Sequence, residues 1–113
     1  MALERGRLST VVQVSTGSTV GIITVESNKK VYVKSIIAHG VGFGTQPTAQ
    51  VYYVPNGATA SENNRLFDIN LSAKETILIE PSYPIVLTQT GDSLHVGTGV
   101  SECNFMIMGD KEV

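Results

Sequence analysis

The density of β-branched residues is the feature that most constrains the fold of this chain. Val, Ile and Thr make up 34 of the 113 residues. Their side chains are restricted at χ1 and favour pleated strands over helices. Most of the 11 glycines and four prolines lie between apolar runs, where turns would be. The chain therefore predicts strands from end to end. The best helical candidate, Ala60 to Phe67, is too short and polar to be more than a turn.

Strand-like runs follow one another at a spacing of about 8–12 residues. They are segments 9–15, 19–26, 31–41, 48–54, 65–71, 76–80, 85–87, 93–96 and 104–108. About eight or nine strands at this spacing are typical of an antiparallel sandwich or barrel. The lack of crossover helices excludes a doubly wound α/β fold. We therefore expect an all-β fold, a single antiparallel β-sandwich of the jelly-roll kind.

The longest run, 31–41, predicts its own two faces, because successive side chains of a strand point in opposite directions. Strict alternation divides it into two sets: Val31, Val33, Ser35 and Ile37, and then Tyr32, Lys34, Ile36 and Ala38. Because Lys34 belongs to the second set, we expect the face of that set to be exposed to water, although Ile36 indicates that the face is partly covered.

Length and charge limit the classes of protein that this chain can belong to. A chain of 113 residues fits one domain, which we expect at 11–113, preceded by an N-terminal arm at 1–10. The formal net charge of −2 argues against nucleic acid as a partner. No apolar run approaches the length of a membrane helix, and the first residues lack a signal peptide's apolar region. We therefore expect neither membrane association nor export by the general secretion route.

The residues that carry chemistry do not form a recognisable catalytic or metal-binding pattern. His39 and His95 are the only histidines, and Glu80 and Glu102 lack the spacing that a cupin-like metal site needs. Either histidine could in principle serve Ser35, Ser93 or Cys103, but no Gly-x-Ser-x-Gly elbow is present. We expect no enzymatic activity and no metal.

Two further features have simple structural interpretations. The glycine-rich segment 40–44 lacks the helix and the Lys-Ser/Thr pair of a phosphate-binding loop, so we expect a loop and no cofactor. The single cysteine, Cys103, cannot form an internal disulfide, and we expect its thiol to be buried and inert.

Two tyrosines are candidates for an exposed contact. Tyr52 and Tyr53 are adjacent in a strand, so we expect one in the core and the other exposed. An exposed strand tyrosine, for which we choose Tyr52, serves either an interface or cross-strand packing. Tyr52 or Tyr32 could also be the platform of a carbohydrate-binding module, although the chain has no Trp.

Several phrases of the sequence resemble small β-sandwich proteins of tailed bacteriophage particles. They are Lys29-Lys-Val-Tyr-Val-Lys-Ser-Ile-Ile-Ala38, Ala49-Gln-Val-Tyr-Tyr-Val-Pro-Asn-Gly57, Asn64-Arg-Leu-Phe-Asp-Ile-Asn-Leu-Ser-Ala-Lys-Glu-Thr76, Pro84-Ile-Val-Leu87 and Thr90-Gly-Asp-Ser-Leu-His-Val96. The resemblance spans about residues 19–108 and consists of turn and core positions, not of a catalytic motif. Proteins of this group are head decoration (cement) proteins and neck or tail accessory proteins.

The resemblance implies a non-enzymatic virion structural protein, in the first place a capsid decoration protein that stabilises the head lattice. Its partners would be the major capsid protein or other virion proteins, and copies of itself in a homo-oligomer. It would be assembled in the host bacterial cytoplasm. The alternatives are a neck or tail accessory protein, a carbohydrate-binding module that recognises host surface glycans, and, remotely, an enzyme of cupin type.

Residues 1–10 lie outside the resemblance. Leu3, Arg5, Arg7 and Leu8 precede the first predicted strand and could dock as an arm on a neighbouring subunit. The alternative is a frayed terminus.

Overall fold

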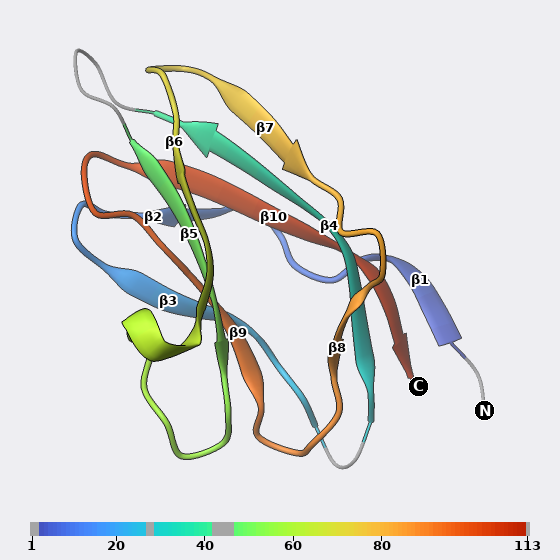
Figure 1. Ribbon diagram of the computed structural model, residues 1–113. Helices are drawn as coiled ribbons and strands as arrows, with labels where there is room; N and C mark the ends of the chain where they lie inside the picture. Colours follow the sequence, from blue (N-terminus) through green and yellow to red (C-terminus); the bar gives the residue numbers. More distant parts are fainter. Residues whose placement is uncertain (1–2, 27–28, 42–46, 113) are drawn as a thin grey trace.

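The structure is a computed structural model that describes residues 3–26, 29–41 and 47–112. The described residues form ten strands and one short 3₁₀ turn, η1 (Figure 1). The strands are β1 (Leu3–Arg7), β2 (Val12–Val14), β3 (Thr19–Thr24), β4 (Val31–Gly40), β5 (Thr48–Val54), β6 (Arg65–Asn70), β7 (Thr76–Ile79), β8 (Ile85–Leu87), β9 (Ser93–Gly97) and β10 (Cys103–Glu112). The predicted turn within 60–67 is confirmed as η1 (Glu62–Asn64), which Ser61 and Asn64 close with a capping box.

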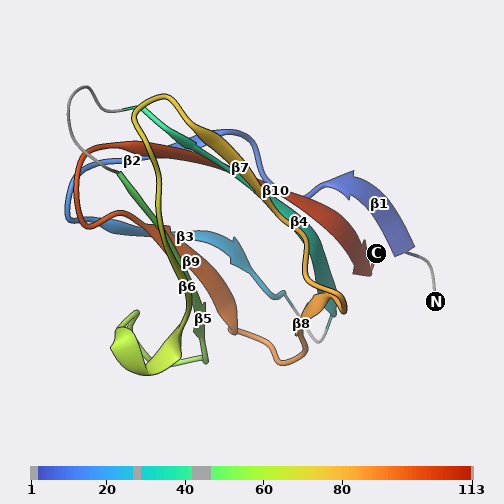
Figure 2. The same ribbon diagram turned by 45° about the horizontal axis from the view of Figure 1, so that its top comes forward.

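The strands form two antiparallel sheets that pack face to face as two layers (Figure 2). Sheet A has the order β1-β10-β4-β7, with β2 also paired to β10 and β8 also paired to β4. Sheet B has the order β3-β9-β5-β6. If β1 with β2 and β7 with β8 each count as one interrupted edge strand, the connections are those of an eight-stranded jelly roll. The predicted all-β sandwich is therefore confirmed.

The strand lengths differ from the prediction at the two ends of the chain. β1 lies in a segment that we did not expect to be a strand, and β10 continues to Glu112 through the polar residues 109–112. The two additions pair with each other, from Leu3 opposite Glu112 to Arg7 opposite Met108. Neither segment has an alternating apolar pattern, so only the pairing makes each one a strand.

The predicted alternation of 31–41 is wrong after Val33, because β4 contains a β-bulge. Ser35 pairs with Met108 and Val33 pairs with Gly109, which leaves Lys34 as an extra residue. The two faces exchange at this point, so that Ile36 is completely buried and Ile37 points outward and is half-buried.

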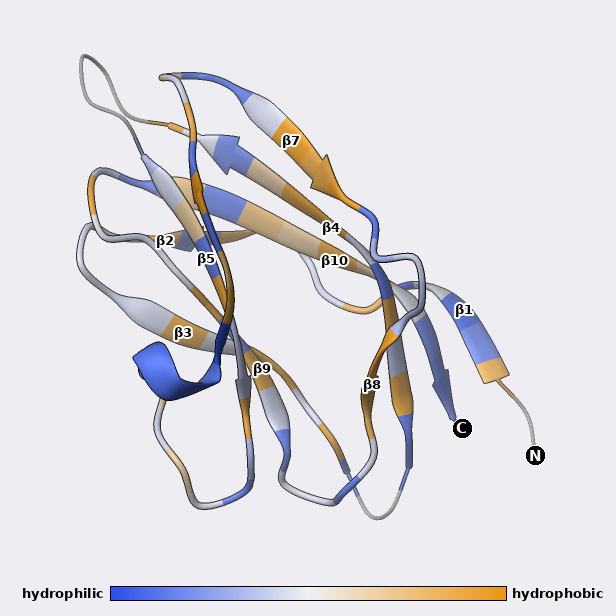
Figure 3. Ribbon diagram, viewed as in Figure 1, coloured by the Kyte–Doolittle hydropathy of each residue, from blue (hydrophilic) through white to orange (hydrophobic). Residues whose placement is uncertain are grey.

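The core lies between the two sheets and takes residues from nearly every strand. Its largest fully buried side chains include Phe105 and Ile107 of β10, Ile36 of β4 and Leu94 of β9. β1 and η1 are mainly hydrophilic, in contrast to the apolar stretches of β7 and β8 (Figure 3). Within the described ranges, no helix is long and apolar enough to span a membrane.

Candidate interaction surface

β1 is bound to the rest of the molecule through its backbone and not through buried side chains. Its five residues pair with the last five residues of β10, and all five are exposed. Leu8, which follows β1, is half-buried and packs against the core, and its N–H donates to the Ile107 carbonyl at 2.8 Å. The strand thus lies on the edge of sheet A with Leu8 as its anchor.

Ion pairs on both faces of sheet A link β1 to β10, and one of them also joins β10 to β4. Asp110 is 5% exposed and accepts Lys34 Nζ at 2.7 Å, with Arg5 Nε at 3.5 Å. The hydrogen bond from Lys34, aided by the charge of Arg5, holds the pKa of Asp110 below its ordinary value against the opposing effect of desolvation. On the other face of the strand, Lys111 Nζ lies 3.7 Å from Glu4 Oε1.

The predicted arm residues divide into two groups. Leu3, Arg5 and Arg7 are exposed on β1, whereas Leu8 faces inward. Within one chain the segment pairs with β10. Its docking on a neighbouring subunit stays a prediction.

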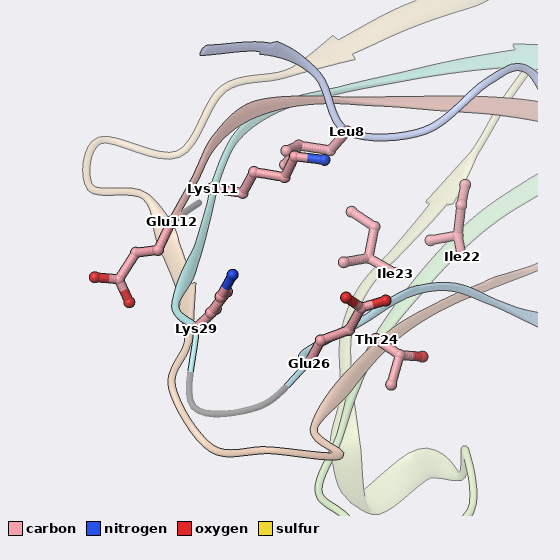
Figure 4. Close-up of a pocket in the computed structure, with 8 residues that line it drawn as sticks. All are labelled: Leu8, Ile22, Ile23, Thr24, Glu26, Lys29, Lys111 and Glu112. Carbon is pink, nitrogen blue, oxygen red and sulfur yellow. The ribbon is translucent and has the colours of Figure 1, made fainter. Parts of the chain in front are cut away.

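A cleft opens between β3 and the β1–β10 edge, with a volume of about 410 Å³. Leu8 and Ile23 form apolar parts of its wall, and Lys29, Lys111 and Glu26 surround the space (Figure 4). Glu112 also borders the cleft, but its carboxylate points away, and its Oε1 accepts the backbone N–H of Lys30 at 2.6 Å. The cleft therefore mixes both charge signs around a small apolar wall.

The outer face of sheet A carries a row of apolar side chains that the sequence did not predict. Ile37 is in register with Met106 of β10 on one side and with Leu78 of β7 on the other. Val11, just before β2, borders the same shallow hollow of about 170 Å³ as Ile37 and Met106. Leu78 is 54% exposed and Val11 is 63% exposed. We call Val11, Met106, Ile37 and Leu78 the outer row. The bulge at Lys34 places Ile37 in this row, which is why strict alternation could not find it.

The two histidines are engaged in local contacts on outer faces of the sheets. His39 Nδ1 lies 2.7 Å from Thr76 Oγ1 of the adjacent strand β7. The His95 ring covers Gly21, and its Nδ1 lies 3.2 Å from Ser93 Oγ. Burial lowers the pKa of His95. Within the residues described, no three His, Cys, Asp or Glu side chains come together as a metal site.

Cys103 is completely buried in β10, as predicted. Desolvation raises the pKa of its thiol to about 11, so that the nucleophilic thiolate is disfavoured at neutral pH. The residues of the glycine-rich segment at 42–46 lie outside the described part of the chain.

The expectation that Tyr52 is exposed has to be corrected, because only 5% of the residue is accessible. Arg65 and His95 stand opposite it on the two neighbouring strands, and its hydroxyl donates to Gln50 Oε1 at 3.0 Å. These neighbours cover its ring on the outer face of sheet B, so Tyr52 offers no open platform for a sugar. Tyr32 is half-buried on the outer face of sheet A.

Comparison with known proteins gives matches in fold only. No family model matches the chain, and no curated protein matches it in sequence. A chain from the structure of infectious bursal disease virus strain Gx aligns with 97% of this chain at a TM-score of 0.55 and 15% identity. A chain from the crystal structure of the T13 particle of the same virus aligns with 97% at a TM-score of 0.53 and 7% identity. This chain spans about a third of those two chains, 31% and 30%. At such low identities the likeness shows a common fold.

Proposed function

We propose that this protein is a non-enzymatic structural protein of a virus particle, and more specifically a decoration protein of a bacteriophage head. The observation that carries the proposal is the fold, a jelly-roll sandwich of which 97% aligns with chains from virus-particle structures. The phrases that resemble tailed-phage virion proteins support the phage assignment.

The contacts of the chemically capable side chains also favour a structural role. His39 and His95 bind or cover residues of neighbouring strands. Asp92, which is 8% exposed, accepts the Tyr53 hydroxyl at 2.9 Å and the Asn56 N–H at 3.0 Å. These groups hold turns and strands together, which is what a stable building block requires.

The function would be mechanical. A decoration protein binds a symmetric lattice through many copies, so that weak single contacts add up by avidity. The outer row supplies an apolar patch for such a contact, and the edge of β1 supplies a charged one. Bridging of neighbouring capsid subunits would then raise the resistance of the head to internal pressure.

Quantitative mass spectrometry of purified particles of the virus that encodes the chain tests this function. A copy number comparable to that of the major capsid protein is expected. A small fraction of that number would overturn the decoration role in favour of a neck or tail component. Absence from the particle would overturn the virion role altogether.

A pair of leucine variants tests the contact surface. Leu78→Ser removes an apolar group of the outer row, whereas Leu66→Ser changes a leucine of β6 with a similar exposure, 47% against 54%. We expect Leu78→Ser to reduce rebinding to particles assembled without the chain, and Leu66→Ser to leave it unchanged. Equal effects of the two variants would contradict the assignment of the outer row.

A further inference from the structure

We propose that the open edge of β1 binds an extended acidic segment of another virion protein, which adds a strand to sheet A. The identity of the partner as a virion protein rests on the proposed function. The chemistry of the segment, an extended backbone with carboxylate side chains, rests on the edge itself.

The edge offers hydrogen-bonding groups without a partner strand. β1 is the terminal strand in the order of sheet A and pairs only with β10 among the described residues. In an antiparallel ladder, alternate residues direct their peptide groups away from the paired strand. These groups of β1 therefore point toward solvent, and none of its side chains is buried over them. Extended peptides bind such edges by main-chain hydrogen bonds.

The charge around the edge specifies an acidic occupant. The β1 end of the molecule comprises residues 3–8, 26, 29–35 and 108–112, which meet through the β1–β10–β4 ladders and the cleft. Six of the eight basic side chains of the chain lie there, but only four of its ten acidic ones. The whole chain has a net charge of −2, so this end is locally positive, at +2, on an acidic protein.

The two arginines of β1 make this positive charge available. Arg7 forms no ion pair within the described residues, and the Arg5 side chain is 85% exposed although it approaches Asp110. Asp110 and Glu112 are at most 6% exposed and present little negative charge to a ligand. Residues two apart on a strand share a face, so both arginines lie on one face of the edge. Carboxylates of an added strand would pair with them there.

A second copy of β1 fits this edge poorly. Two copies of β1 would pair as antiparallel strands related by a two-fold axis. Directly opposite residues then lie on the same face of the sheet, so only every second register is possible. Registers that pair three or more residues of β1 then place Glu4 opposite Glu4, Arg5 opposite Arg5, or Arg5 opposite Arg7. Like charges directly opposite each other are destabilising. The edge therefore favours an acidic strand of a different sequence.

Short peptides of defined charge test the edge on the purified protein. The probe is the acetylated and amidated hexapeptide Glu-Thr-Glu-Thr-Glu-Thr, added to ¹⁵N-labelled protein and followed by NMR. We expect amide shifts at residues 3–7 and at the facing part of β10. We expect no such shifts with Lys-Thr-Lys-Thr-Lys-Thr or with a backbone N-methylated acidic peptide. Equal shifts with the basic peptide, or shifts only elsewhere, would overturn the proposal.

A charge-reversal pair separates this edge from general electrostatics. Arg7→Glu should weaken binding of the acidic peptide at low salt by about tenfold. Lys74→Glu makes the same charge change in the turn before β7, at the opposite end of sheet A, and should leave the affinity unchanged. Unchanged amide spectra of the core confirm that both variants are folded. Equal loss in both variants would overturn the proposal.

Photo-crosslinking on the particle identifies the occupant. With a photo-reactive residue in place of Leu3, which is exposed at the start of β1 and leaves both arginines in place, the expected product joins β1 to an acidic, extended segment of another virion protein. A crosslink to a second copy, or to a neutral or basic segment, would overturn the inference while the protein still counts as a virion component. A wild-type chain that is absent from particles would overturn the proposed function and leave the peptide result standing.

Discussion

β1 and the middle of β10 belong to the same sheet and are paired in the same way, yet they differ in what each contributes. Phe105 and Ile107 of β10 are at most 1% exposed, whereas all five residues of β1 are exposed. β1 depends on main-chain hydrogen bonds and on ion pairs with Lys111 and Asp110. Main-chain pairing is thus enough to form a strand, whereas the burial of apolar side chains is what makes a strand contribute strongly to the stability of the fold.

Replacement of Phe105 by Ala should destabilise the protein more than any change in β1. The change removes a fully buried ring from the centre of the core and should lower the free energy of unfolding by about 4 kcal/mol. Urea unfolding measures the loss. Met106→Ala, one residue further on the half-buried outer face, is the matched control and should cost about 1 kcal/mol. Equal costs would contradict the assignment of the two faces.

Gly109→Ala tests the bulge where the buried part of β10 gives way to the part that pairs with β1. A Cβ atom at this position would collide with the Tyr32 carbonyl oxygen and would lie 3.0 Å from Lys34 N. Because both are backbone atoms, the strand must shift, and we expect a loss of about 2–3 kcal/mol. Gly99→Ala is the control, since its nearest contact is Thr48 Oγ1 at 3.4 Å. A stable Gly109→Ala variant would mean that the bulge is pliable.

Deletion of residues 1–7 should have a much smaller effect than the loss of the Phe105 ring. The deletion removes exposed side chains, one ladder and surface ion pairs, so we expect about 1 kcal/mol less stability and an intact fold. Urea unfolding measures the stability, and near-UV circular dichroism shows whether the fold is intact. A loss of several kcal/mol would show that β1 is an integral part of the core.

Acid should detach β1 before it unfolds the core. The pKa of Asp110 is lowered in the folded state, so its contribution is present above the ordinary carboxyl range, about pH 4, and is lost as the pH falls through the lowered value. The protection of the amides of residues 3–7 against hydrogen exchange, measured relative to an unstructured chain at the same pH, should therefore fall below about pH 4. Asp110→Asn should remove this pH step. A step that persists in the variant would assign it to another carboxylate.

Protonation of His95, on sheet B and away from β1, should change the stability only slightly. Burial lowers its pKa, so the unfolded chain takes up a proton first as the pH falls below about 6.5, and stability decreases in that range. Thermal unfolding between pH 7.5 and about pH 5 measures the slope, which His95→Gln should reduce. An unchanged slope in His95→Gln would place the titrating group elsewhere.

The parts of the fold that could be predicted are those specified by neighbouring residues in the sequence. Turn residues and β-branched runs act over a few positions, so nine strands, the turn at 60–67 and the burial of Cys103 could be predicted. β1 and the end of β10 could not, because their polar sequences become strands only by pairing with each other. The outer row could not either, since one extra residue at Lys34 exchanges the two faces of β4.

The local pattern of residues specifies an antiparallel β-sandwich, because stiff β-branched side chains and regularly spaced turns leave the chain few other folds. Which strands lie at the edges of the sheets, and which side chains remain on the surface, depends on contacts between distant segments. The ladder of β1 and β10 joins Leu3 to Glu112 across nearly the whole chain, and residues of neighbouring strands cover Tyr52. Such contacts depend on the global path of the backbone, which no local pattern of residues encodes.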